Sequence, residues 1–299
     1  MRVLTSYPTV GRVGHQFSQL FTAKHLSLLV PGYRYWHSRF VNGAGPCDQA
    51  AIWEDFLDLG RGQVEINFRA RTYPEFRYVT PARSPDKTEW DSKRLFGILA
   101  NMPDEMIFEV ADRGFAWWES RYWPDNQFTA TAEFFQQQVF RSPAYQACQL
   151  VYEPTAKLQA CFYRRTPSLY EPRTHESWYV EPSYFAGVWA WLVDRYGQDK
   201  LAKPLLFTQT LWDDFSEPVW APFRVIAADD KYPAVFQAFK SCVECDIFVG
   251  SVGDTTGLVR TLRHNRGKLS IGVDAFGWPD RPRYSDGLHF TRDGQLVRG

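Results

Sequence analysis

The chain has 299 residues and carries 34 basic and 34 acidic side chains, so its formal net charge is zero. This balance argues against a dedicated DNA or RNA binder, which normally shows an excess of basic residues. The length suits about two domains, and the 17% of aromatic residues argues against intrinsic disorder. No apolar run is long enough to predict a transmembrane helix.

The N-terminal sequence MRVLTSYPTVGRVGHQ lacks the apolar segment of a secretory signal peptide. Five cysteines are too few for a disulfide framework in a chain of this length, and the odd number leaves at least one thiol free. We therefore expect a soluble, cytoplasmic protein.

The N-terminal half shows alternating predicted elements. Apolar spacing predicts strands at 2–6, 63–70 and 106–110, and helices at 15–29 and 131–140.

The C-terminal half is more regular. Predicted strands lie at 158–163, 205–208, 224–227 and 246–250, and predicted helices at 183–196, 232–243 and 256–264. The segment 278–299 is polar and predicted to be a loop. Strands that alternate with helices are typical of an α/β fold with parallel sheets. We expect two Rossmann-like domains, residues 1–155 and 156–299, facing a central cleft, with ligands bound beyond the carboxyl ends of the strands.

Three loops follow predicted strands and have the composition of anion-binding sites. The first is GRVGHQ at 11–16. Its glycines allow the backbone to approach a ligand closely, and the N–H groups and dipole of the following helix favour an anion. The alternative is an ordinary tight turn between a strand and a helix.

The second loop begins with Arg164 and Arg165, at the end of the strand at 158–163. Two adjacent guanidinium groups match the oxygens of a diphosphate and keep their charge at any working pH. A solvated surface pair is the alternative.

The third loop is GSVGDTT at 250–256, which leads into a predicted helix. Its hydroxyl and amide groups at the start of a helix suit a phosphate. The alternative is an ordinary helix N-cap formed by Asp254 or Thr255.

Together and in this order, the three loops resemble segments of the fucosyltransferase-like glycosyltransferases of the GT-B fold, which include α1,6-, α1,2- and protein O-fucosyltransferases. GRVGHQF at 11–17 resembles their G-R-x-G-N-Q segment, and FYRRT at 162–166 resembles their H-x-R-R motif. CDIFVGS at 245–251, followed by DTT, resembles their A-D-x-x-[VI]-G-[ST] segment and its hydroxyl pair.

The resemblance implies an inverting, metal-independent glycosyltransferase that needs no cofactor. Its partners are a nucleotide-sugar donor, with GDP-fucose favoured, and a glycan or other hydroxyl acceptor. Arg164 matches the arginine that grips the donor diphosphate and assists departure of the nucleotide. The other implied donor-site residues are Gly14, Gln16, Arg165, Ser251, Asp254, Thr255 and Thr256.

The acceptor hydroxyl needs a base to take its proton. In the α1,6-fucosyltransferase branch a glutamate shortly after the arginine pair has this role, and Glu171 lies in the corresponding stretch. His15, His175 and Glu176 are competing candidates.

The loop after the strand at 106–110 supplies candidates for the acceptor site. Asp112 and Arg113 follow that strand, and Trp117 is able to stack on an acceptor sugar. Packing of Trp117 in the core is the alternative.

Some positions differ from the family pattern and keep other functions open. Phe162 occupies the place of the motif histidine, and Gln237 and Ala238 occupy the region where some members read guanine with an acidic residue. A transferase that uses a UDP-sugar, such as a xylosyl- or rhamnosyltransferase, is therefore an alternative, as is a non-catalytic sugar- or nucleotide-binding module. The CxxC at 242–245 lacks a second pair of zinc ligands, which favours a role in the core.

Overall fold

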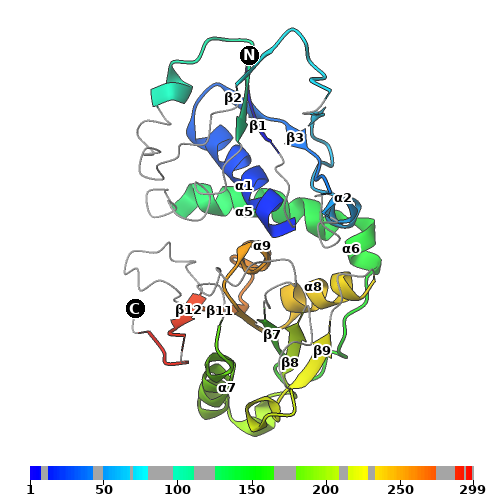
Figure 1. Ribbon diagram of the computed structural model, residues 1–299, viewed down its shortest axis with the longest axis vertical. Coiled ribbons are helices and arrows are strands. Elements are labelled where there is room, and N and C mark those ends of the chain that lie inside the picture. The colour runs from blue at the N-terminus through cyan, green and yellow to red at the C-terminus, as the bar shows by residue number, and fades with distance from the viewer. Residues whose placement is uncertain are drawn as a thin grey trace. The chain divides into compact units, whose positions relative to one another are not determined.

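The computed structural model describes residues 1–7, 13–42, 50–67, 70–79, 97–110, 125–164, 180–208, 215–227, 233–273, 287–292 and 294–297. The chain forms two compact units (Figure 1). Unit 1 contains Met1–Gln146, and unit 2 contains Ala147–Pro279 and Arg283–Gly299. This division lies after Gln146, whereas the sequence places a boundary near residue 155.

Unit 1 is built on a parallel sheet with the strand order β2-β1-β6-β5. Its strands are β1 (Arg2–Ser6), β2 (Tyr33–Tyr35), β5 (Arg77–Val79) and β6 (Met106–Val110). A second, two-stranded parallel sheet pairs β3 (His37–Ser38) with β4 (Glu65–Ile66). The helices described in this half of the chain are α1 (Val13–Leu29), α2 (Ala51–Leu57), α5 (Asp125–Arg141) and α6 (Pro143–Ala147), the last of which lies at the unit boundary.

Helix α1 packs against both the sheet and α5. Most of its apolar side chains are buried, including Phe17, Leu20 and Phe21, and the rings of Phe17 and Phe135 meet edge to face with centroids 5.0 Å apart. The opposite face of the sheet carries a smaller cluster, formed by Val3, Trp36, Ile66 and Ile107.

Unit 2 contains a six-stranded parallel sheet with the order β12-β11-β10-β7-β8-β9. Its strands are β7 (Ala160–Arg164), β8 (Leu205–Thr208), β9 (Arg224–Ala227), β10 (Ile247–Gly250), β11 (Leu269–Val273) and β12 (Gly287–Phe290). Its helices are α7 (Pro182–Tyr196), α8 (Ala234–Glu244) and α9 (Asp254–Arg263), with the short 3-10 helices η3 (Gln198–Lys200) and η4 (Pro218–Trp220).

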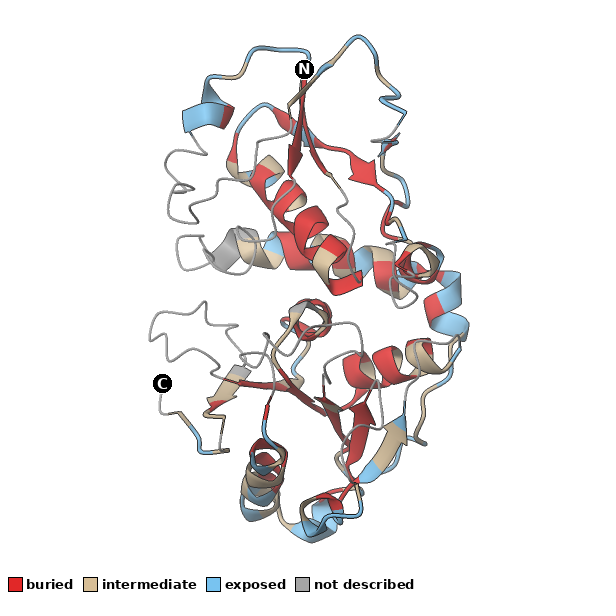
Figure 2. Ribbon diagram, viewed as in Figure 1, coloured by how far each residue is buried: buried red, intermediate tan, exposed pale blue. Residues whose placement is uncertain are grey.

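The central strands of unit 2 are buried on both faces (Figure 2). Figure 1 shows α7 on one side of the sheet and α8 and α9 on the other. Phe162 of β7 packs with Phe185 and Trp189 of α7, whereas Cys161, its neighbour on the strand, faces the other side. Continuous burial of short apolar strands is what a parallel sheet covered on both faces requires.

The α/β class and the two Rossmann-like units with parallel sheets are confirmed. Several predicted bounds differ from the structure. The alternating segment at 63–70 contributes only the short strand β4 among the described residues, α5 begins earlier than the predicted helix at 131–140, and β7 includes Arg164.

The prediction of a loop over 278–299 is wrong in part. Strand β12 pairs in parallel with β11 and buries Phe290 to 1% exposure. Its four residues carry too little apolar periodicity to be recognised from the sequence alone. Within the described part of the chain, no helix combines the length and apolar character needed to cross a membrane.

Candidate functional site at the carboxyl edge of the unit 2 sheet

The structure brings the first residues of the second and third predicted loops to neighbouring strands. Strands β7 and β10 are neighbours, with Tyr163 paired with Gly250. The backbone N–H of Ser251 donates to the carbonyl oxygen of Tyr163 at 3.0 Å. Arg164 and Ser251, which lie far apart in the sequence, therefore both lie at the carboxyl edge of the same sheet.

Arg164 ends strand β7 and is fully buried. Its Nη1 donates to the carbonyl oxygen of Val180 at 2.9 Å. The guanidinium carbon lies 5.0 Å from the ring centroid of Trp220 and 5.4 Å from that of Phe185. Rings around a desolvated guanidinium stabilise its charge and restrict its orientation. The alternative of a solvated surface arginine is therefore wrong for Arg164, and its contact with a diphosphate stays a prediction.

The third loop turns directly into α9. The helix begins at Asp254, and its N-cap is Gly253 with φ of 142°, without a side-chain cap. The alternative that Asp254 or Thr255 forms the N-cap is therefore wrong. Glycine suits this position because L side chains avoid this backbone region.

The hydroxyl groups of the third loop have different environments. Thr256 is buried and its Oγ1 donates to the carbonyl oxygen of Ser251 at 2.7 Å. Ser251 is also buried, whereas Thr255 is half-buried. A Cβ at Gly250 would lie 2.3 Å from Cγ2 of Thr256, so the start of α9 packs directly on the end of β10.

Arg260 is a charged residue at this edge that the sequence analysis missed. It lies one turn after Thr256 on the same side of α9 and is buried. Its Nη1 lies over β11, 2.6 Å from the position of a Cβ at Gly272. The sequence did hold a signal that could have identified Arg260. It follows Thr256 by four residues, so a helix places it one turn beyond the hydroxyl loop.

Tyr184 of α7 completes the described group. Its hydroxyl donates to the carbonyl oxygen of Gly250 at 3.1 Å. Burial raises the pKa of Tyr184, and the nearby charge of Arg260 partly offsets the rise. The edge thus combines two buried guanidinium groups, several hydroxyls and a helix N-terminus, which is a suitable set for binding an anion.

The first predicted loop belongs to unit 1, where α1 begins. Gln16 is buried, and its side-chain amide makes two hydrogen bonds to the backbone of Val41, at 2.7 and 2.9 Å. It therefore anchors the chain after β3. Gly14 is buried, and His15 is half-buried. The roles of Gly14, His15 and Gln16 at a donor or catalytic site stay predictions.

Several predicted site residues lie outside the described residues. These are Arg165 and Glu171 in the second loop, and Asp112, Arg113 and Trp117 after β6; the side chain of Asp254 also lies outside the described part of the structure.

The cysteines of the CxxC lie in the core of unit 2, as predicted. Cys242 and Cys245 are buried, beside Cys161 and Arg263. Burial alone would raise the pKa of the Cys245 thiol, but a hydrogen bond from Cys161 and the charge of Arg263 bring it below its usual value. In the described ranges, no group of three or more His, Cys, Asp or Glu is arranged to hold a metal ion.

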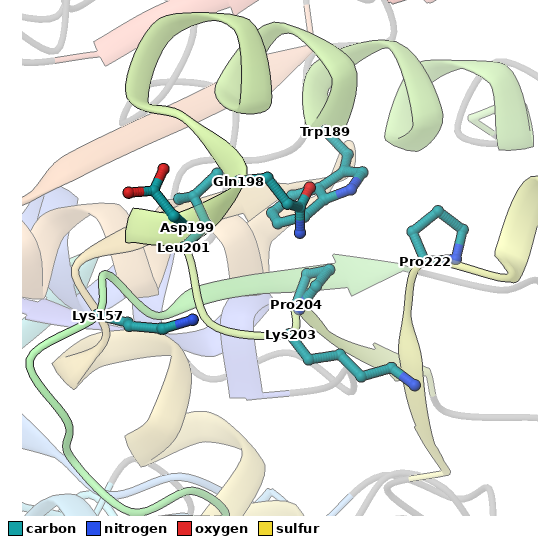
Figure 3. A pocket seen from close by; sticks show the side chains of 8 residues that line it. All are labelled: Lys157, Trp189, Gln198, Asp199, Leu201, Lys203, Pro204 and Pro222. Atoms are coloured by element: carbon teal, nitrogen blue, oxygen red, sulfur yellow. The ribbon is translucent and has the colours of Figure 1, made fainter.

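A cavity of about 810 Å³ lies at the other end of this sheet (Figure 3). Its lining residues lie within or after α7, or precede β7, β8 and β9: Lys157, Trp189, Gln198, Asp199, Leu201, Lys203, Pro204 and Pro222. Ligands of parallel α/β sheets bind beyond the carboxyl ends of the strands. We therefore place the candidate site at the edge formed by Arg164, Ser251 and Arg260.

No family model matches the chain, and the comparison with curated proteins finds no match. Among solved structures, E. coli heptosyltransferase WaaC with ADP-2-deoxy-2-fluoro heptose is 12% identical over 97% of this chain and 92% of that chain, with a TM-score of 0.41. POFUT1 in complex with GDP-fucose is 15% identical over 93% of this chain and 98% of that chain, with a TM-score of 0.44. E. coli ADP-heptose LPS heptosyltransferase II is 13% identical over 97% of this chain and 90% of that chain, with a TM-score of 0.43. Similarity at this level does not assign a family or an activity to the chain.

Proposed function

We propose that this protein is a nucleotide-sugar-dependent glycosyltransferase of the GT-B type, with the donor diphosphate at the carboxyl edge of the unit 2 sheet. One observation carries the proposal. The arginine motif and the hydroxyl loop, which the resemblance assigns to the same diphosphate, end adjacent strands and are joined by the hydrogen bond from Ser251 to Tyr163.

The chemistry requires positive charge where the nucleoside diphosphate leaves. Arg164 and Arg260 supply two guanidinium groups in a desolvated environment, where their effect on developing negative charge is greater than in water. The N-terminus of α9 adds the partial positive charge of its free N–H groups. In this proposal the arginines take the role of a metal ion.

Inversion at the anomeric carbon follows from a single displacement by the acceptor hydroxyl. Glu171 is the proposed base, with His15 as the second candidate. GDP-fucose is the favoured donor. A UDP-sugar is the second candidate. In α8, the two positions where a carboxylate would recognise guanine are Gln237 and the buried Ala238, and neither side chain is acidic.

Thermal unfolding of the full chain with GDP, UDP, GDP-fucose and UDP-sugars, without metal, tests nucleotide binding. A ligand at about 100 times its Kd stabilises the folded state by about 2.7 kcal/mol. A shift with GDP supports the fucosyl donor, and a shift with UDP supports the second candidate. If no nucleotide shifts the transition, the proposed donor site is wrong.

Arg164→Lys separates an enzyme from a non-catalytic binding module. Lysine keeps the charge but loses the planar fork, so transfer to a glycan acceptor is expected to slow by about 10²-fold or more. Arg195→Met is the control, because Arg195 is an exposed arginine of α7 that also packs on aromatic rings. A wild-type chain that binds the nucleotide sugar without transferring the sugar supports the binding module.

A further inference from the structure

The cavity at the amino end of the unit 2 sheet has no role in the proposed function (Figure 3). Its volume of about 810 Å³ lies within the range of about 300–1,000 Å³ that is typical of small-molecule sites. All of its lining residues belong to unit 2. The cavity lies at the opposite end of the strands from Arg164 and Ser251, so a ligand there leaves the candidate donor site free.

Backbone hydrogen bonds hold the walls of the cavity in place. The segment before β7 is joined to the segment after α7, because the N–H of Leu158 donates to the carbonyl oxygen of Lys200 at 2.9 Å and the N–H of Ala202 donates to that of Leu158 at 3.0 Å. The loops before β8 and β9 are joined by the N–H of Arg224, which donates to the carbonyl oxygen of Pro204 at 2.9 Å. A cavity whose backbone is already fixed binds a ligand at a smaller cost in conformational entropy.

Part of the lining is apolar. Trp189 of α7 is 7% exposed, and Leu201 and Pro204 are buried. The ring centroid of Trp189 lies 6.4 Å from that of Phe162 and 6.5 Å from that of Phe223, so rings of the core fix the position of the indole. This part of the cavity suits the apolar body of a ligand.

The charged residues of the lining are two lysines and one aspartate. Lys157, Lys203 and Asp199 are exposed. In the described part of the chain, neither ammonium group makes a hydrogen bond or an ion pair. Figure 3 shows the carboxylate of Asp199 pointing away from both lysines. The cavity therefore offers two positive charges that no described side chain balances, which favours an anionic ligand.

We propose that this cavity is a second ligand site, which binds a small organic acid with a flat apolar body. The apolar body packs against Trp189 and Pro204, and the acid group, a carboxylate or a phosphate, binds Lys157 and Lys203. A mainly apolar lining with a few polar groups is the usual composition of a small-molecule site. The inference goes beyond the proposed function, because no residue of the candidate donor site lines the cavity.

Fluorine NMR of the full chain labelled with 5-fluorotryptophan locates the binding. The probes are 1-naphthoate, 1-naphthyl phosphate and the neutral 1-naphthalenemethanol. We expect at least one of the two acids to shift the signal of Trp189, which is assigned with Trp189→Phe. The signal of Trp191 is the control and is expected to stay, because this residue of the same helix packs on Phe290 of β12 with centroids 5.4 Å apart.

The two acids distinguish a carboxylate site from a phosphate site. A tighter complex with 1-naphthoate assigns the carboxylate, and a tighter complex with the phosphate assigns the phosphate. If neither acid shifts the Trp189 signal, or if the neutral alcohol binds as tightly as the acids, the proposal is overturned.

Lys203→Gln and Lys200→Gln are matched variants in one loop. Each removes one exposed positive charge, but only Lys203 lines the cavity. Lys203→Gln is expected to raise the Kd of the bound acid about three-fold, and the double variant K157Q/K203Q about ten-fold, because exposed ion pairs are lost. Lys200→Gln is expected to leave the Kd unchanged. All of these variants should unfold at nearly the wild-type urea concentration. Equal Kd values for the wild type and the double variant overturn the proposal.

Nucleotide melts keep this site and the proposed function distinguishable. A wild-type chain in which an acid shifts the Trp189 signal, but which neither GDP nor UDP stabilises, supports the cavity site and contradicts the proposed function. A chain that a nucleotide stabilises, but whose Trp189 signal responds to neither acid, contradicts the cavity site alone.

Discussion

Arg263, the last residue of α9, is a buried cation whose hydrogen bonds go mainly to backbone carbonyls. These carbonyls belong to the end of α8 and the strands beside it: Cys242, Val243, Cys245, Asp246 and Leu269. Its Nε also donates to the hydroxyl of Ser270 at 3.0 Å. The carboxyl end of a helix carries partial negative charge, which this guanidinium offsets. One side chain therefore joins α8, α9, β10 and β11.

Arg263→Met is expected to destabilise unit 2 by about 3 kcal/mol or more, because several buried carbonyl oxygens lose their donor. The free energy of unfolding in urea measures this. Arg195→Met, at an exposed arginine, is expected to change it by less than about 0.5 kcal/mol. Similar effects of the two variants would contradict the role given to Arg263.

His25 of α1 is a buried histidine in unit 1. Its Nδ1 lies 2.9 Å from Oγ1 of Thr131, and its ring stacks on Phe21 with centroids 6.1 Å apart. Burial lowers the pKa of His25 to about 3. The unfolded chain therefore takes up a proton at higher pH than the folded chain does.

The sign of this shift predicts how stability depends on pH. The contribution of His25 is fully present above its unfolded pKa of about 6.5 and decreases as the pH falls toward 3. In this range, protonation of His25 in the unfolded chain lowers the free energy of unfolding by up to about 1.4 kcal/mol for each pH unit.

His25→Gln is expected to remove the contribution of His25 to the dependence of the free energy of unfolding on pH. Urea unfolding between pH 5 and 7 is the measurement, because Glu54, whose pKa is lowered by its bond to His37 despite burial, titrates below this window. Parallel pH profiles of the two proteins would refute the assignment.

At the scale of elements, the candidate donor site depends on how closely α9 packs on the sheet. The absence of a side chain at Gly272 of β11 leaves room for the guanidinium of Arg260. Likewise, the absence of a side chain at Gly250 of β10 leaves room for the side chain of Thr256. These glycines are needed for a close approach, and their φ values do not require glycine.

Gly272→Ala is expected to displace Arg260, because a Cβ would lie 2.6 Å from its Nη1. The end of an arginine side chain moves easily, so the free energy of unfolding should change by less than about 1 kcal/mol. Nucleotide binding should weaken about ten-fold, as expected for one lost hydrogen bond to a charged group. Isothermal titration with GDP and UDP measures the effect, and an unchanged Kd would remove Arg260 from the donor site.

Gly187 in α7 lies against Gly294 near the C-terminus. A Cβ at Gly187 would lie 2.7 Å from the carbonyl oxygen and 2.9 Å from Cα of Gly294, which are backbone atoms. Gly187→Ala is therefore expected to destabilise the protein by about 1–3 kcal/mol. Gly97→Ala is the control, because a Cβ there meets nothing within 4 Å. Differential scanning calorimetry compares the two, and equal melting temperatures would contradict the contact.

At the scale of the whole molecule, each unit has its own parallel sheet and its own buried residues. The buried strands that were predicted well, such as β6, β8 and β10, are short apolar runs bounded by turn residues. Their burial leaves a local pattern in the sequence. Strands β2 and β12, with three and four residues, are too short to show a periodic pattern. Strand β11 was also missed, although LSIGV is as apolar and as buried as the strands that were predicted.

The same distinction holds for the candidate sites. Residue type and position after a predicted strand are enough to single out Arg164, Ser251 and Thr256 as candidates. The sequence alone did not predict that Arg164 packs against aromatic rings. It also did not predict the hydrogen bonds of Thr256 to Ser251 and of Gln16 to the backbone of Val41. It also did not reveal Arg260 over Gly272, or the ion pair of Arg71 with the buried Glu109.

The sequence by itself determined the α/β class, most of the central strands and the loops in which to look for chemistry. Apolar periodicity and glycine placement are local properties that can be read along the chain. The tertiary structure decided which side chains become buried, which loops become neighbours and which polar atoms lack partners. These depend on the register between strands and the packing of helices across many intervening residues, which local spacing does not encode.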